Sequence, residues 1–200
     1  MKAENLNAEE KILKAAEEVF LRDGYSGSRM QDIADLAGIN KAMLHYYFRS
    51  KDKLFEHIFD KKVSIMFPQM EELFETKDNF IDIVSAFIEK YLELLIENPF
   101  LPLFVVSTIN KADNKEFIEK LPTRFIAKLI ERYYEDFHLQ KVRELNPFQF
   151  VMSVFSMCAF PFMAKPMILK ATNANNEAFT ALMKNRVSEI QLYIGLILKP

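Results

Sequence analysis

The stretch SRMQDIADLAGINKAMLHYYF, at residues 28–48, predicts two short helices joined by a tight turn. Ser28 suits the N-cap of the first helix, and Gln31 three residues later completes a capping-box pattern. Gly38 predicts the turn, because a residue without a Cβ enters the left-handed backbone region without a steric penalty. Asn40 then suits the N-cap of the second helix. Apolar residues recur at helical spacing in both segments, so each helix has one face that can be buried.

Two helices of this length around a glycine turn match a helix-turn-helix, which places its second helix in the major groove of DNA. Leu44 and Phe48 stand four residues apart and are expected to face inward. On the opposite side Lys41 brings positive charge, while His45 and Tyr46 bring hydrogen-bonding groups and flat apolar surface. An ordinary corner between two helices has the same pattern, so the motif alone leaves both interpretations open.

The motif and its flanks resemble the N-terminal DNA-binding domain of the TetR family of bacterial transcriptional regulators. The resemblance rests on ILKAAEEVFLRDGY at residues 12–25, DIADLAGINKAMLHYYF at residues 32–48 and SKDKL at residues 50–54. It covers under a third of the chain. It implies an all-α fold, in which a three-helix DNA-binding domain with a helix-turn-helix is linked by a fourth helix to a C-terminal helical domain for ligand binding and dimerisation.

DNA contacts are expected from the first turns of both helices, from the outer face of the second helix and from a lysine in the fourth. They are Ser28, Arg29, Gln31, Asn40, Lys41, Ala42, Met43, His45, Tyr46, Tyr47 and Lys51. The outer face of the second helix is expected to read bases, whereas Lys51, where the family often has a lysine, is expected to meet phosphate. Arg29, His45 and Tyr47 differ from the family's commonest residues, which affects the expected target sequence rather than DNA binding itself.

Composition and charge agree with a helical protein that carries its positive charge locally. The formal net charge is −2, half of the 200 residues are hydrophobic and only 4 are glycine. This composition favours packed helices over a turn-rich β-fold. Cys158 is the single cysteine, so no disulfide can form within the chain, and the polar N-terminus lacks the apolar core of a signal peptide. We therefore expect a cytoplasmic protein.

The rest of the chain predicts further helices. A fourth helix is expected to follow Ser50 and to end near Phe67, because Pro68 disfavours helix at the residue before it. The predicted end of this helix divides the chain into a DNA-binding domain over residues 1–66 and an effector-binding and dimerisation domain over residues 67–200. In the second domain, helical periodicity and its breaks predict helices at 79–97, 99–110, 115–137 with a bend or break at Pro122, 147–169 and 176–198.

A homodimer is expected through the helices at 147–170 and 176–198. The last helix carries a long apolar stripe with no later element to cover it, and Ile190 is expected to lie in the interface. The segment 148–164 is apolar almost all round. A membrane span is one interpretation, and a helix buried between the core and a partner subunit is the simpler one.

An apolar or amphipathic small-molecule effector is expected between the helices of residues 79–170, where aromatic and methionine side chains concentrate. The candidate lining residues are Phe87, Tyr91, Phe104, Phe125, Phe155 and Phe162, unless all of them fill a tight core. No catalytic or metal-ligand motif occurs, so no enzyme activity, cofactor or metal is expected. The resemblance implies a DNA-binding regulator, usually a repressor, that is released from a near-palindromic operator by its ligand. The alternative is a helical lipid-binding protein or enzyme with a purely structural helix-turn-helix.

Overall fold

A computed structural model of the protein describes residues 2–111 and 115–200, with side chains from Ala8 onward. These residues form helices and no strand, so the predicted all-α class is confirmed. The chain divides into two compact units, one up to Ile65 and the other from Met66 onward. Each unit has a core of its own.

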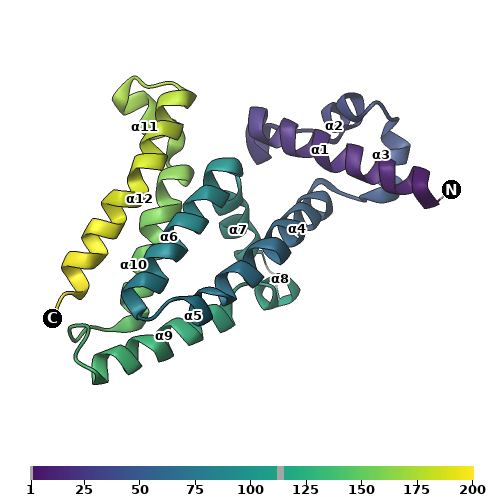
Figure 1. The fold of residues 1–200 in the computed structure, drawn as a ribbon. Helices are drawn as coiled ribbons and strands as arrows, with labels where there is room; N and C mark the ends of the chain where they lie inside the picture. The colour runs from purple at the N-terminus through teal and green to yellow at the C-terminus, as the bar shows by residue number, and fades with distance from the viewer. Residues whose placement is uncertain (1, 112–114) are drawn as a thin grey trace. The chain divides into compact units, whose positions relative to one another are not determined.

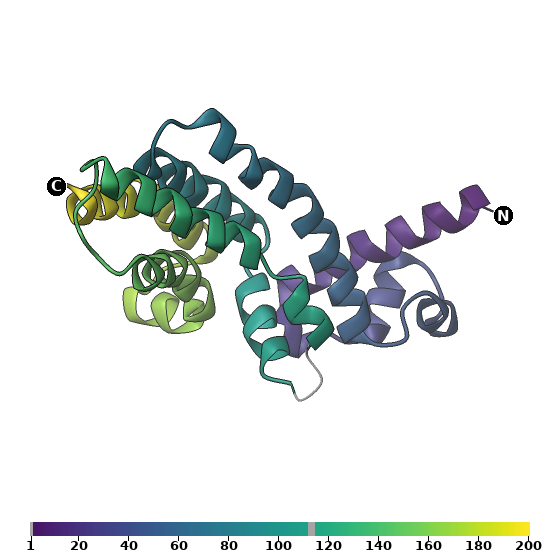
Figure 2. The ribbon, with the colours of Figure 1, turned by 90° about the horizontal axis from the view of Figure 1, so that it is seen from below.

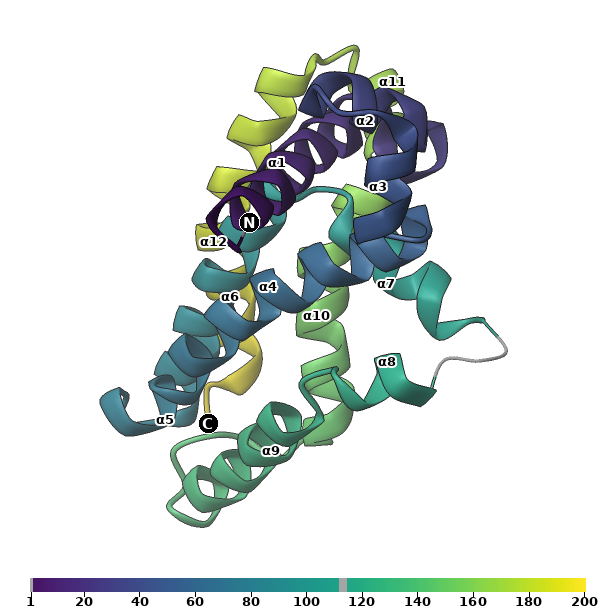
Figure 3. The same ribbon diagram turned by 90° about the vertical axis from the view of Figure 1, so that its right-hand side faces the viewer.

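The N-terminal unit contains α1 (Lys2–Gly27), α2 (Met30–Ala37), α3 (Lys41–Tyr47) and the first part of α4 (Lys51–Glu71). Figure 3 shows α2 lying beside α1, with α3 leading toward α4. The backbone of α1 leaves helical geometry at Gly24, where φ is 69° and ψ is 172°. The core is made of apolar side chains from all four helices, which include Ile12, Val19, Phe20, Ile33, Leu44, Leu54, Phe55 and Ile58.

Helix α4 is longer than the sequence predicts. The expected end near Phe67 is wrong, because the helix continues through Pro68 to Glu71. Proline removes one helical hydrogen bond at its own nitrogen, but its carbonyl still accepts from the amide of Glu72 at 3.0 Å. Met70, in the turn after the proline, is buried, and burying a methionine stabilises by about 1.5–3 kcal/mol. Tertiary packing thus offsets the local preference against helix.

The C-terminal unit contains the remaining helices, and its predicted breaks near residues 99 and 122 are confirmed. The helices are α5 (Leu73–Thr76), α6 (Phe80–Glu97), α7 (Leu101–Ile109), α8 (Lys115–Glu119), α9 (Thr123–His138), α10 (Pro147–Met163), α11 (Lys165–Thr172) and α12 (Asn176–Leu198). Helix α6 packs against α9, α10 and α12, and Figure 1 shows α6, α10 and α12 side by side. Asn79, Asn146 and Asn175 cap three of these helices through side-chain oxygens that accept backbone N–H groups.

The two C-terminal long helices present one apolar face to the core and another to solvent. On α10, Val154 and Cys158 are buried, whereas Phe148, Met152 and Phe160 are exposed. On α12, the expectation that Ile190 lies at a subunit interface is wrong. Its side chain is 0% exposed in the single chain, because it lies on the stripe of α12 that faces the core. The outward apolar residues of α12 are Leu182, Leu192, Tyr193, Leu196 and Ile197.

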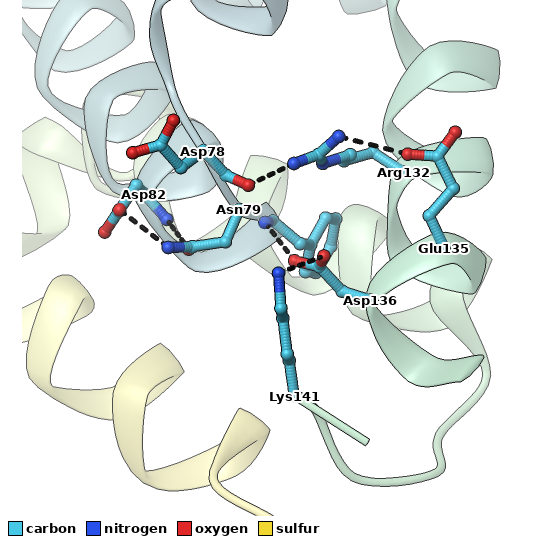
Figure 4. A network of polar contacts seen from close by, with 8 residues as sticks. Asp78, Asn79, Asp82, Arg132, Glu135, Asp136 and Lys141 are labelled. Carbon is cyan, nitrogen blue, oxygen red and sulfur yellow. Dashed lines mark hydrogen bonds and ion pairs between the residues drawn. The ribbon is translucent and has the colours of Figure 1, made fainter. Parts of the chain in front are cut away.

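A buried carboxylate joins α9 to the start of α6. Asp136 Oδ2 accepts from the backbone amide of Phe80 at 2.6 Å, and Lys141 Nζ lies 3.8 Å from Oδ1 (Figure 4). Arg132 donates to the carbonyl of Asp78 in the same network. A carboxylate at a helix N-terminus satisfies an unpaired N–H and favours the helix dipole. These contacts fix where α6 begins.

A second set of contacts closes the far end of α12. The Tyr133 hydroxyl accepts from the amide of Leu145 at 2.8 Å, which orders the segment after α9. The amide of Arg143 in that segment donates to the carbonyl of Leu198 at 3.1 Å. Figure 2 shows the C-terminal end of α12 beside this segment.

Among the described residues, no single helix is both long and apolar enough to cross a membrane, although the bent pairs α6–α7 and α10–α11 reach that length and composition together.

Candidate nucleic-acid interface

The turn between α2 and α3 has the predicted conformation. Gly38 has φ 67° and ψ 32°, in the left-handed region. Its amide donates to the carbonyl of Asp35 at 3.2 Å, and the amide of Ile39 donates to the carbonyl of Ala34 at 3.0 Å, which together form a Schellman motif. Asn40 then accepts the amide of Met43 on its side-chain oxygen at 2.7 Å. The predicted roles of Gly38 and Asn40 are confirmed, and they fix where α3 starts.

The predicted capping box at the start of α2 is wrong. The helix begins at Met30, and its N-cap residue is Arg29, whose side chain makes no capping hydrogen bond. Ser28 is 3% exposed; its hydroxyl donates to the carbonyl of Tyr25 at 2.8 Å and its amide to the carbonyl of Gly24 at 3.2 Å. Gln31 reaches forward to Asp35 instead, at 2.7 Å. Ser28 thus closes the turn after Gly24, and both of its donors are used inside the protein.

Helix α3 is held by one buried side chain and shows the rest of its surface to solvent. Leu44 is fully buried, whereas Lys41, Ala42, Met43 and His45 are exposed and Tyr46 is 81% exposed. Figure 3 shows the helix at the edge of the unit. The structure therefore brings most of the predicted contact residues of α3 onto one outer surface.

The two tyrosines at the end of α3 differ in burial. The rings of Tyr46 and Tyr47 meet edge to face, with centroids 5.5 Å apart and an angle of 89° between their planes. Tyr47 is half-buried, and Phe48, which follows, is buried. Tyr46 is the aromatic side chain that projects into solvent.

One nitrogen of the His45 ring has a partner within the protein. Its Nδ1 lies 3.2 Å from the carbonyl oxygen of Arg49. A carbonyl oxygen only accepts, so Nδ1 carries the hydrogen. In the neutral ring Nε2 is then an acceptor, and the exposed side chain can offer it to a donor on a DNA base.

Lys51 does not lie with the outward cations. Its Nζ donates to the carbonyl of Tyr25 at 2.6 Å and to that of Ser28 at 3.1 Å, and it lies 4.4 Å from the centroid of the Tyr25 ring. Burial lowers the pKa of the Lys51 ammonium. Arg29 and Gln31 are exposed at the start of α2. Sequence reasoning missed the role of Tyr25. The acceptor is its backbone carbonyl, and every residue type has one, so the sequence does not mark this position.

Comparison with known proteins identifies this N-terminal unit. Residues 12–58 match the family described as bacterial regulatory proteins, tetR family. The N-terminal unit therefore contains a domain of this family. The chain is similar to the HTH-type transcriptional repressor NicS of Pseudomonas putida, with 50% identity over 52 residues. That match covers 24% of each protein, so the chain spans about a quarter of the length of this curated relative.

Solved structures extend the likeness from the N-terminal unit to the whole fold. The regulator PfmR of Thermus thermophilus has a TM-score of 0.68 and 19% identity, over 90% of this chain and 96% of that one. The transcriptional regulator FadR of Bacillus subtilis, in complex with stearoyl-CoA, has a TM-score of 0.57 and 21% identity, over 89% of this chain and 95% of that one. At these identities the likeness shows the fold.

In the C-terminal unit, four of the predicted effector residues form one aromatic cluster. The ring centroid of Phe87 lies 5.4 Å from that of Tyr91, 5.1 Å from that of Phe125 and 5.0 Å from that of Phe155. Of the other two predicted residues, Phe104 packs on Phe117 and Phe162 packs on Phe179. The structure therefore brings together four of the six candidates.

Three surface hollows surround α6 and the start of α9. One of about 350 Å³ is lined by Phe67, Glu71 and residues 119–125, and so includes Phe125 of the aromatic cluster. The others measure about 410 Å³, between α4, α5 and α6, and about 700 Å³, between α6 and α12. The other five candidate residues do not line these three hollows.

The aromatic cluster borders a buried thiol. Cys158 is fully buried, and this burial raises the pKa of its thiol to about 12, with Arg186 opposing the change. Burial also raises the pKa of Tyr91, and the nearby Cys158 adds to the shift. Both groups are therefore neutral at physiological pH.

Proposed function

We propose that the chain is a DNA-binding transcriptional regulator that acts as a repressor. The observation that carries the proposal is the outer surface of α3, where Lys41, Ala42, Met43, His45 and Tyr46 stand exposed on a helix whose start is fixed by the turn before it. An α-helix presented in this way fits the major groove, where each base pair has its own pattern of donors and acceptors. The similarity to NicS, a transcriptional repressor, supports the direction of regulation.

We further propose that the protein binds a near-palindromic operator as a homodimer through α10 and α12. One helix-turn-helix makes few contacts, whereas two related by a two-fold axis reach successive major grooves about 34–36 Å apart. The exposed apolar residues Phe148, Met152 and Phe160 of α10 and Leu192 and Leu196 of α12 support this interface, because a monomer would leave them in water.

The proposed effector is a small apolar or amphipathic molecule bound near the cluster of Phe87, Tyr91, Phe125 and Phe155. Support comes from the cluster itself and from the FadR structure, whose bound stearoyl-CoA has the matching chemistry. Such a ligand releases DNA only if it binds more tightly to a conformation that fits the operator poorly. Stearoyl-CoA is the first probe: it should raise the melting temperature and lower operator affinity, with free coenzyme A as the control.

Selection from a library of random DNA duplexes tests the DNA-binding proposal. The wild-type chain should enrich a near-palindromic sequence, and binding should then be measured by fluorescence anisotropy on the selected and on a random duplex. Lys41→Ala should lose about 1–3 kcal/mol on the selected duplex and relax specificity at one position. Lys184→Ala on α12, an exposed lysine of the other unit, is the matched control and should bind as the wild type does.

Two results would contradict these proposals separately. An equal loss on both duplexes would make Lys41 a phosphate contact rather than a base contact. A folded wild-type chain that enriches no sequence and binds no duplex, but takes up stearoyl-CoA, would favour a helical lipid-binding protein with a purely structural helix-turn-helix.

A further inference from the structure

We propose that Lys51 is a positioning residue, which sets the placement of the helix-turn-helix by holding the last turn of α1, and that it does not bind DNA phosphate. This inference rests on the proposed DNA-binding function and names a residue on which the placement of α3 depends. Lys51 is the first residue of α4, whereas the two carbonyls that it contacts belong to residues 25 and 28.

The contacts of Lys51 suit the end of a helix. The last carbonyls of a helix lack intrahelical donors and carry the negative end of the helix dipole, so a lysine ammonium is a favourable partner there. The carbonyl of Tyr25 accepts from Lys51 Nζ and also from the hydroxyl of Ser28. Both donors therefore act on the short segment that follows the break at Gly24.

The ring of Tyr25 completes the same arrangement. It meets the ring of Phe55 edge to face, with centroids 5.1 Å apart and an angle of 89°, and it lies 6.0 Å from Phe20. Phe55 stands one turn after Lys51 on α4, so α4 contacts Tyr25 through both a charge and an apolar ring. A cation over an aromatic face is attracted by the negative charge of the ring's π-system. Tyr25 is therefore held from two directions by one helix.

The held segment leads directly into the DNA-binding motif. Ser28 is followed by Arg29, the N-cap residue of α2, so the position of residues 25–28 determines where α2 starts. Because the turn at Gly38 joins α2 to α3, the position of α2 also determines the position of α3. An error at the start of α2 displaces base-reading side chains, and specific contacts depend on placement far more than nonspecific phosphate contacts do.

The ammonium of Lys51 is also poorly available for phosphate. It has three N–H groups, and two carbonyls and one ring face occupy three directions around it. A phosphate oxygen would have to displace one of these partners. The two roles give different results when DNA binding is measured as a function of salt, because only a phosphate contact releases counterions.

The test compares Lys51→Met, which keeps the apolar stem, with Ser28→Ala, which removes one donor to the Tyr25 carbonyl without changing charge. Lys53→Met is the matched control for charge, since Lys53 is exposed and pairs with Glu56 on the same helix. For each full-length variant, the melting temperature and the salt dependence of affinity are measured on a selected and a random duplex. Measurements are made well below the melting temperature.

For Lys51→Met we expect a lower melting temperature, a loss of at least tenfold on the selected duplex, a smaller loss on the random duplex and an unchanged salt slope. Ser28→Ala should change the same quantities in the same direction by less, and it keeps the test valid if Lys51→Met fails to fold. Lys53→Met should leave the preference for the selected duplex unchanged.

An unchanged melting temperature for Lys51→Met, with equal losses on both duplexes and a salt slope shallower by about 0.9, would overturn the proposal and make Lys51 a phosphate contact. If Lys51→Met bound both duplexes with wild-type affinity and Ser28→Ala had no effect, that result would also count against the proposal. Absence of DNA binding by the wild-type chain would instead refute the proposed function, and this inference with it.

Discussion

The hydrogen bond of His45 predicts which bases this side chain would read if α3 enters the major groove as proposed. Because Nδ1 donates to the carbonyl of Arg49, the neutral ring offers Nε2 as an acceptor. In the major groove an acceptor pairs with the amino group of adenine N6 or cytosine N4, and not with guanine O6 or N7. Selection from random duplexes at neutral pH should therefore show adenine or cytosine at one position of each half-site, and His45→Ala should lose that preference. Enrichment of guanine at the affected position would contradict the assignment.

Cys158 should resist alkylation in the folded protein. Burial raises the pKa of its thiol to about 12, above the ordinary value of 9.0, so almost no reactive thiolate exists at pH 8. The shift also affects stability: the unfolded thiol ionises first, so this contribution is intact below pH 9 and is lost as the pH rises toward 12. Mass spectrometry after iodoacetamide treatment at pH 8 should show modification only in denaturant. Equal rates with and without denaturant would show that the thiol is accessible.

At the scale of the helix, a proline in α10 leaves one backbone carbonyl without its helical donor, and a side chain of α12 bonds to it. Pro161 has no N–H, so the carbonyl of Met157, four residues earlier, lacks its helical donor. Arg186 on α12 supplies one, with Nε 2.8 Å from that oxygen. This explains why a guanidinium occupies a position on the mainly apolar inner stripe of α12, between Met183 and Ile190.

A double-mutant cycle tests this pairing. Arg186→Met should destabilise the protein by about 1.5–3 kcal/mol in urea unfolding, because the carbonyl loses a charged donor. In the Pro161→Ala background the backbone N–H at position 161 restores a donor, so the same Arg186→Met change should cost less. Equal costs in both backgrounds would show that Arg186 stabilises through packing alone.

Helix boundaries were predictable where a local device sets them. Asn40, Asn79 and Asn146 cap their helices through contacts within three residues, and Gly38 needs only its own backbone freedom. The capping box proposed at Ser28 failed because its hydroxyl has two local choices, and the carbonyl of Tyr25 is the one used. Such a choice depends on the neighbouring helices rather than on the residues in the motif.

The same limit applies to the two sets of residues proposed to contact DNA and the effector. The outer face of α3 could be predicted from Leu44 and Phe48, which stand four residues apart. An inward residue on a short helix determines which residues face outward. The effector residues did not follow, since an aromatic side chain looks the same in sequence whether it packs in a cluster, as Phe87 does, or in a separate pair, as Phe162 does. Ile190 likewise could not be assigned to the core or the interface from periodicity alone.

At the scale of the molecule, the proposed dimer should depend on the outer face of α12. Leu196 is 64% exposed in the single chain, so Leu196→Glu should leave each chain folded while placing an unpaired charge in the interface. Sedimentation at micromolar concentration should show a dimer for the wild type and a monomer for the variant. Gln69→Glu adds the same charge at an exposed position of α4, outside the proposed interface, and is the control, which should remain dimeric.

A wild-type chain that sediments as a monomer at this concentration would refute the dimer. An undisturbed dimer for Leu196→Glu would place the interface elsewhere.

In α3 the residues that determine the fold are different from the residues that face solvent, and this separation has an evolutionary consequence. Its fold depends on Gly38, Asn40 and the buried Leu44, whereas Lys41, Ala42 and Met43 point to solvent. Substitutions at exposed helix positions usually change stability by less than about 0.5 kcal/mol. If α3 reads DNA as proposed, two copies of the gene could therefore diverge in the promoters that they recognise through a few substitutions, with little change in the stability of the shared scaffold.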